Sequence, residues 1–176
     1  MMRELERRVS LDTPQLKALQ TPLKDRYRGD PEAALVTLHA EGTLGEEDVS
    51  CSVETGRALV TAGLHPASGG DGSLACSGDM LLHALAACAG VTLRSVAINR
   101  GVSLSGRVRV EGDLDFRGTM GVDRSVPVGF LEIRVTFDIE SDADAATLDA
   151  VLDATERYCV VLQTLRGSPS VTFARG

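Results

Sequence analysis

Residues 79–99 read DMLLHALAACAGVTLRSVAIN, and this stretch decides the fold. Apolar side chains recur on nearly all sides of the helix that it predicts, so we expect that helix to be buried all round. Ser77 or Asp79 is available as the N-terminal cap, and Gly101 stands just past the last apolar turn. The apolar run 81–91 contains a histidine and falls short of the roughly 20 residues of a membrane span. We therefore expect a central core helix and no membrane partner.

Two segments after this helix alternate between apolar and charged residues, namely 106–118 (GRVRVEGDLDFRG) and 130–140 (FLEIRVTFDIE). A period of two predicts β-strands that bury one face and expose the other to water. The inward residues are expected to be Val108, Val110, Leu114, Phe116, Leu131, Ile133, Val135, Phe137 and Ile139. The two segments therefore predict two long antiparallel strands.

Shorter elements precede the central helix. Residues 13–28 place leucines at helical spacing, although Pro22 would kink or split that helix. Residues 35–63 predict three short strands joined by hairpins, and residues 63–78 form a loop rich in Gly and Ser.

A second amphipathic helix follows the long strands, with Ser141 or Asp142 as its cap. Its apolar face comprises Leu148, Val151, Leu152, Thr155, Tyr158 and Cys159. A short strand at 170–174 closes the chain. Because the strands do not alternate with helices as in a parallel sheet, we expect the α+β class.

Length and charge limit the classes of function. The 176 residues suit one domain with its own core. The net charge of −7 argues against nucleic acid, because binding to phosphates needs a basic surface. The first residues are charged and lack the apolar segment of a secretory signal, so we expect a cytoplasmic protein. The four cysteines form no C-x-x-C pair, and no metal site is expected.

Two cysteines stand in unusual contexts. Cys88 lies in the middle of the most apolar helix, and Cys159 ends the apolar face of the second helix. If both helices lie on one sheet, the two side chains can meet and exchange between dithiol and disulfide. Such chemistry requires a thiolate, which a nearby cation or a helix N-terminus stabilises. The alternative is that both are buried structural thiols.

The residues around both cysteines resemble those of a known family. The segment SGDMLLHALAACAGVTLRSVA (77–97) is similar to the central-helix signature of the OsmC/Ohr proteins, and ERYCVVLQTL (156–165) is similar to the segment around their second cysteine. The resemblance implies an OsmC-like fold, with antiparallel sheets packed around a long buried central helix in an intertwined homodimer. It implies an OsmC-like domain at 31–176, preceded by an N-terminal helical extension at 1–30.

The function that this resemblance implies is that of a thiol-dependent peroxidase for organic hydroperoxides. Cys88 would be the peroxidatic residue and Cys159 the resolving one. The reductant would be a dithiol or a lipoylated protein, and no cofactor is expected. The alternative is an OsmC-like protein that binds a hydrophobic ligand without efficient peroxidase activity.

The chain also departs from the family pattern. Well-studied members carry a Glu ten residues before the first cysteine, where this chain has Gly78, and a Pro where it has Val160. Asp79 is the nearest carboxylate, but nine steps of about 100° place it opposite Cys88 on a regular helix. Arg57 is a candidate for the activating cation, with a solvated turn residue as the alternative. Asp79 and Arg57 are therefore the expected supporting residues.

Overall fold

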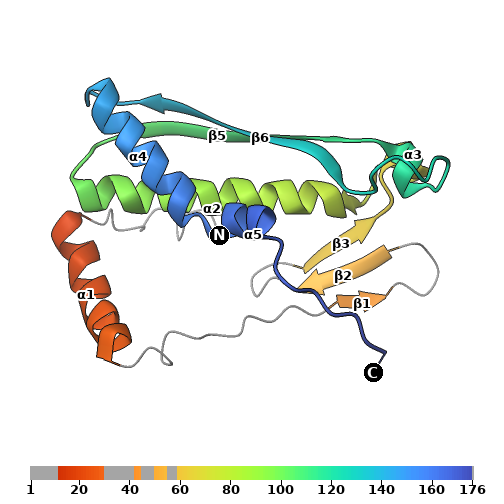
Figure 1. Cartoon of the computed structure of the whole chain (residues 1–176), viewed down its shortest axis with the longest axis horizontal. Helices are drawn as coiled ribbons and strands as arrows, with labels where there is room; N and C mark the ends of the chain where they lie inside the picture. Colours follow the sequence, from red (N-terminus) through yellow and green to blue (C-terminus); the bar gives the residue numbers. More distant parts are fainter. Residues whose placement is uncertain (1–11, 30–41, 45–49, 55–58, 176) are drawn as a thin grey trace, which may run out of the picture.

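The central element of the computed structural model is helix α2 (Ser77–Arg100), which lies along the two longest strands of the molecule (Figure 1). The structure describes residues 12–29, 42–44, 50–54 and 59–175. The N-terminal cap of α2 is Cys76, without a capping side chain, so the expected cap at Ser77 or Asp79 is wrong. The reason is that strand β4 (Ala75–Cys76) leads directly into the helix. Gly101 ends it as expected, in the left-handed conformation with φ 69°.

Only one face of α2 is buried within the chain. Leu85, Ala89, Leu93 and Ala97 lie on that face at intervals of four residues. On the opposite side Val91 is 71% exposed, so the expectation of a helix buried all round is wrong for the single chain. With its 24 residues, α2 is long and apolar enough to cross a membrane by length and composition, as core helices of water-soluble proteins also are.

The buried face of α2 packs on a two-stranded antiparallel sheet of β5 (Ser105–Leu114) and β6 (Phe130–Glu140). Val108 pairs with Phe137 and Val110 with Val135, and these side chains join the core as expected. The outer face carries charged side chains. There the Arg134 guanidinium lies 2.5 Å from an Asp113 carboxylate oxygen.

Two expected inward residues of these strands lie elsewhere. Asp113 pairs with Glu132 and Leu114 with Phe130, so the ladder skips Leu131, which is 55% exposed. Phe116 is not in a strand but begins the short helix α3 (Phe116–Thr119). The Asp115 side chain ends the alternation because it accepts a hydrogen bond from the Arg117 backbone N–H and caps that helix.

Two helices cross α2 near its middle (Figure 1). Helix α4 (Ala145–Tyr158) is capped by Asp144, which accepts a hydrogen bond from the Thr147 N–H at 2.7 Å. The expected cap at Ser141 or Asp142 is wrong, because the Ser141 hydroxyl instead donates to the Ser103 carbonyl oxygen. Helix α5 (Val160–Gly167) follows directly.

The end of the chain also differs from expectation. Tyr158 is exposed rather than part of the apolar face of α4. Residues 168–175 are exposed and form no strand, which corrects the expected strand at 170–174. No described element of the same chain covers the Tyr158 side chain or residues 168–175.

A second sheet contains β1 (Gly42–Leu44), β2 (Ser50–Glu54), β3 (Leu59–Gly63) and β4. β2 and β3 form the expected antiparallel hairpin, β1 pairs antiparallel with β2, and β4 runs parallel to β3. The Gly/Ser-rich loop before α2 contains the 3-10 helix η2 (Pro66–Ser68) and β4. Residues 35–41 of the first expected strand lie outside the described residues.

The N-terminal helix α1 (Thr13–Gly29) forms as expected and contains Pro22. It docks against the C-terminal end of α2, where the Thr13 hydroxyl donates to the Ile98 carbonyl oxygen at 2.6 Å. A weaker contact joins the Asn99 amide to Gln20 at 3.5 Å. These contacts tie α1 to the helix that carries Cys88.

We predict that Leu85→Ala lowers the free energy of unfolding by about 2–5 kcal/mol, because Leu85 is fully buried and its truncation leaves a cavity. The matched variant Leu131→Ala should change it by less than about 0.5 kcal/mol, since that side chain already faces water. Urea denaturation followed by circular dichroism measures both values. Similar losses for the two variants would contradict the burial described above.

A pair of cysteines as the candidate active site

The structure brings Cys88 and Cys159 together. Cys88 is half-buried in the middle of α2, and Cys159 is only 1% exposed at the junction of α4 and α5. Both pack in one apolar cluster with Leu85 and Ala89. The two cysteines and Cys76 are free thiols. Residues 71 positions apart in sequence thus form one site.

Cys159 lies where one helix ends and the next begins. Its backbone N–H donates to the Thr155 carbonyl oxygen at 3.0 Å and closes α4. Its own carbonyl oxygen accepts a hydrogen bond from the Gln163 N–H at 2.9 Å in α5. Because Cys159 is also the N-cap residue of α5, the first N–H groups of that helix lie beside the sulfur atoms.

The surroundings of Cys88 favour its anionic form. Burial works against the thiolate, but hydrogen bonds outweigh it and lower the pKa of Cys88 below the ordinary value of a cysteine. The donors are the Val161 N–H, the Cys159 thiol, the Val160 N–H and the Thr92 hydroxyl. The Thr92 hydroxyl also lies 2.8 Å from the Cys88 carbonyl oxygen, so the sulfur and this oxygen compete for its one proton.

The surroundings of Cys159 favour its neutral thiol form instead. Burial raises the pKa of the Cys159 thiol, and the adjacent Cys88 raises it further, although the Leu162 N–H partly offsets both effects. Of the two thiols, Cys88 is therefore the one that ionises first, and Cys159 keeps its proton to higher pH. This asymmetry suits a nucleophile beside a proton donor.

An apolar cavity of about 410 Å³ adjoins the site. Cys159 and Leu162 form part of its wall, together with residues of β6. At its mouth the Arg166 guanidinium pairs with the Glu156 carboxylate. The cavity gives the otherwise buried Cys159 side chain an apolar neighbourhood that a small molecule can enter.

The expected supporting residues do not join this cluster. Asp79 is exposed in the first turn of α2, nine residues before Cys88, which is about 14 Å along the helix axis. Arg57 lies outside the described residues, and its role stays a prediction. Arg94 points away from Cys88, because its guanidinium donates to the Leu104 carbonyl oxygen at 2.7 Å. Among the described residues, no group of three His, Cys, Asp or Glu forms a metal site.

Sequence reasoning missed the groups that stabilise Cys88. Two of the four are backbone N–H groups, of Val160 and Val161, and a sequence does not show where a backbone N–H points. The available signal was the run VVLQTL directly after Cys159, which predicts a new helix whose N-terminus adjoins that cysteine.

The fold and this site define a class of protein, an α+β chain in which a long central helix carries one cysteine beside a second cysteine from another helix end. The OsmC-like protein family matches residues 70–174, more than half of the chain, and the chain belongs to this family. None of the curated proteins matches the sequence.

Several solved structures share the fold. An OsmC-like protein from Mycoplasma pneumoniae is 21% identical with a TM-score of 0.63, covering 75% of this chain and 89% of its own. An organic hydroperoxide resistance protein OsmC from Legionella pneumophila is 20% identical with a TM-score of 0.56, covering 76% and 92%. An OsmC-like protein of unknown function from Vibrio cholerae is 11% identical with a TM-score of 0.52, covering 74% and 94%. At these identities the likeness shows the fold alone.

Val160 offers a direct test of the site. Proline at this first position of α5 keeps the helix but removes one N–H that stabilises the Cys88 thiolate. We predict that Val160→Pro raises the pKa of Cys88 and slows its alkylation by iodoacetamide at neutral pH about fivefold, the equivalent of one hydrogen bond. Val160→Ala keeps the N–H and should react as the wild type does. Identical pH profiles for all three proteins, measured by peptide mass spectrometry, would contradict this account.

Proposed function

We propose that this protein is a thiol-dependent peroxidase that reduces organic hydroperoxides through Cys88 and Cys159. The observation that carries the proposal is the asymmetric pair, in which hydrogen bonds lower the pKa of Cys88 while burial raises that of Cys159. Family membership supports it, and so does the fold shared with a protein described as an organic hydroperoxide resistance protein. The asymmetry supports Cys88 as the proposed peroxidatic residue and Cys159 as the proposed resolving residue.

In the first step the Cys88 thiolate attacks the terminal oxygen of the hydroperoxide. The O–O bond breaks, Cys88 becomes a sulfenic acid, and the alcohol leaves after its oxygen takes up a proton. The Cys159 thiol is the proton donor in this proposal, because it already hydrogen-bonds to the Cys88 sulfur. The apolar residues around both sulfurs favour hydroperoxides with an organic group over hydrogen peroxide.

In the second step the Cys159 thiolate attacks the Cys88 sulfur. A disulfide forms and hydroxide leaves, taking up a proton to become water. Part of what raises the pKa of Cys159 is the negative charge of Cys88, and oxidation of Cys88 to a neutral sulfenic acid removes that charge. Cys159 therefore ionises more readily at the stage when it must act as a nucleophile.

A dithiol then restores both cysteines, and we propose a small dithiol or a lipoylated protein as its source. The apolar cavity beside Cys159 supports a reductant with an uncharged, flexible arm. The proposed compartment is the cytoplasm, where thiols such as the three described free cysteines stay reduced.

We predict that the wild type reduces cumene hydroperoxide with dihydrolipoamide and passes through a Cys88–Cys159 disulfide that peptide mapping detects. Cys88→Ser should abolish turnover, because it removes the thiol whose pKa is lowered, and the pKa of its neighbour Cys159 is raised. Cys159→Ser should leave a sulfenic acid on Cys88 that over-oxidises with excess peroxide. Cys76→Ser is the control and should keep wild-type turnover.

Turnover of the peroxide no faster than that by free cysteine would contradict the proposed peroxidase activity. The second candidate is a protein that binds a hydrophobic ligand, which the cavity of about 410 Å³ supports. Native mass spectrometry distinguishes the two, because a binding protein should retain a ligand after Cys88 is alkylated.

We also propose that two chains form a homodimer across the open face of α2. Ala84, Ala87 and Val91 are exposed on this face at helical spacing, opposite the buried one. Ala84 lies one turn before Cys88, so a second chain packed there would also adjoin the site. A continuous apolar helix face is the usual surface of an isologous contact.

Light scattering at micromolar concentration should give about 37 kDa, twice the chain mass of 18.6 kDa. Ala87→Lys should shift the protein to monomer, because it places a charge in the interface but leaves the folded chain intact. Ala146→Lys, at an exposed position of α4, is the matched control and should remain a dimer. A wild type that is monomeric would overturn the proposed interface.

A further inference from the structure

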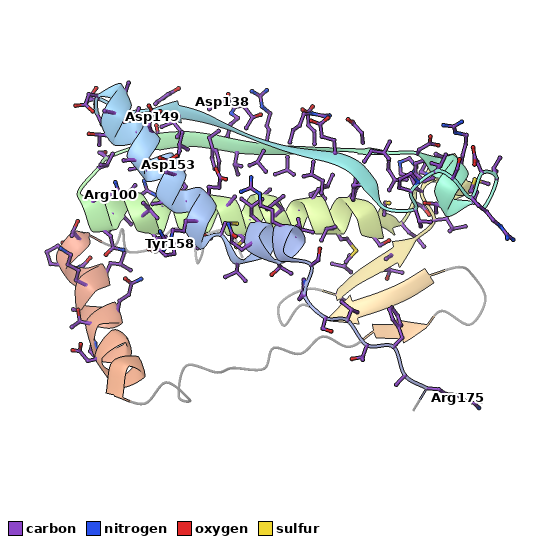
Figure 2. All side chains as sticks on the ribbon, in the orientation of Figure 1. Arg100, Asp138, Asp149, Asp153, Tyr158 and Arg175 are labelled. Carbon is purple, nitrogen blue, oxygen red and sulfur yellow. The ribbon has the colours of Figure 1, made fainter. Side chains whose placement is uncertain are left out.

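A second cavity, of about 670 Å³, lies between α1, α2 and α4. Thr92 and Tyr158 line the end that is nearer the two cysteines. Gln20, Asn99 and Arg100 line the other end, where α1 meets the last turn of α2. Figure 2 shows Tyr158 at the end of α4 and Arg100 at the end of α2. The cavity therefore runs along α2 from Thr92, one turn after Cys88, to Arg100, and neither Cys88 nor Cys159 lines it.

The geometry of α2 gives the distance between Cys88 and Arg100. Cys88, Thr92, Ser95 and Asn99 follow one another at spacings of four, three and four residues, so they share one face of α2. The twelve residues from Cys88 to Arg100 span about 18 Å along the axis. Thr92 connects the two regions, because its hydroxyl interacts with Cys88 and the residue is also one of those that line the cavity.

The two ends of the cavity differ in chemistry. Arg100 is a cation with no carboxylate partner within the described part of the chain, and the Gln20 and Asn99 amides lie beside it. Asp149 and Asp153 of α4 are exposed and do not line the cavity (Figure 2). Between the ends, the wall is apolar at Val91, Val96 and Ala154. This arrangement complements an anionic head group followed by a hydrocarbon chain.

We propose that this cavity binds the carboxylate of a long-chain organic acid at Arg100 and directs the hydroperoxide on its chain toward Cys88. The peroxide end of this proposal rests on the proposed function, whereas carboxylate binding does not. Gln20 belongs to α1, which lies outside the family match at 70–174. The N-terminal helix thus forms a wall of the cavity and takes part in substrate selection.

The first experiment measures binding of dodecanoate by isothermal titration calorimetry, using the full chain with Cys88→Ser so that peroxidase activity is irrelevant. In this background Arg100→Gln should weaken binding about tenfold, as expected for the loss of a charge-assisted hydrogen bond. Arg100→Lys should retain most of the affinity, which separates loss of charge from a folding defect. Arg107→Gln changes an exposed arginine that does not line this cavity and should bind as its parent does. Equal affinities of Arg100→Gln and its parent, or no binding by the parent, would overturn the proposal.

The second experiment measures kcat/KM for linoleate hydroperoxide and for cumene hydroperoxide, which lacks a carboxylate. Arg100→Gln should lower the ratio of kcat/KM for linoleate hydroperoxide to kcat/KM for cumene hydroperoxide about tenfold. Arg107→Gln should leave this ratio at the wild-type value. An unchanged ratio in Arg100→Gln would overturn delivery of the chain to Cys88. If neither peroxide is turned over, the proposed function fails, and the calorimetry still decides the carboxylate site.

Discussion

The packing of Cys159 against α2 is the contact on which the site depends. Cys159 is buried beside Leu85 and Ala89, and at the same residue α4 ends and α5 begins. Holding this one residue against the central helix therefore fixes the direction of two further helices. It also places the first N–H groups of α5 beside Cys88. A displacement of Cys159 would separate the thiol pair and remove these donors together.

Burial and hydrogen bonding act on the pKa of Cys88 in opposite directions. An apolar environment opposes a negative charge, and a thiolate there persists only if donors replace the water that it has lost. None of the described arginines contributes at Cys88 in this chain. Backbone N–H groups of α5 take that part instead. Val160, where a proline is usual, retains an N–H that proline would lack.

Helix α2 serves three purposes on different faces. One face forms the core with β5 and β6, and a second carries Cys88 and the polar residues that continue toward Arg100. The third face is apolar and exposed in the single chain. A helix with three such faces has apolar residues on nearly all sides, and this is why its sequence predicts complete burial although one chain covers only part of it.

The sequence alone determined the elements with a strong period. The central helix, its end at Gly101, the two alternating strands and the amphipathic helix before Cys159 all follow from local patterns of apolar residues and turn formers. The helical contexts of Cys88 and Cys159 singled out the two cysteines, and the resemblance implied their separate roles. Tertiary structure decided the details that depend on neighbours distant in sequence. Leu131 turned outward because the ladder skips one residue, and Ser141 became a link to Ser103 rather than a cap. The stabilisation of Cys88 belongs to the same group, since donors in α5 reach a sulfur in α2 only after both helices have packed. Periodicity records which side of an element is apolar, whereas the direction of backbone N–H groups and the meeting of distant side chains arise only when the elements assemble.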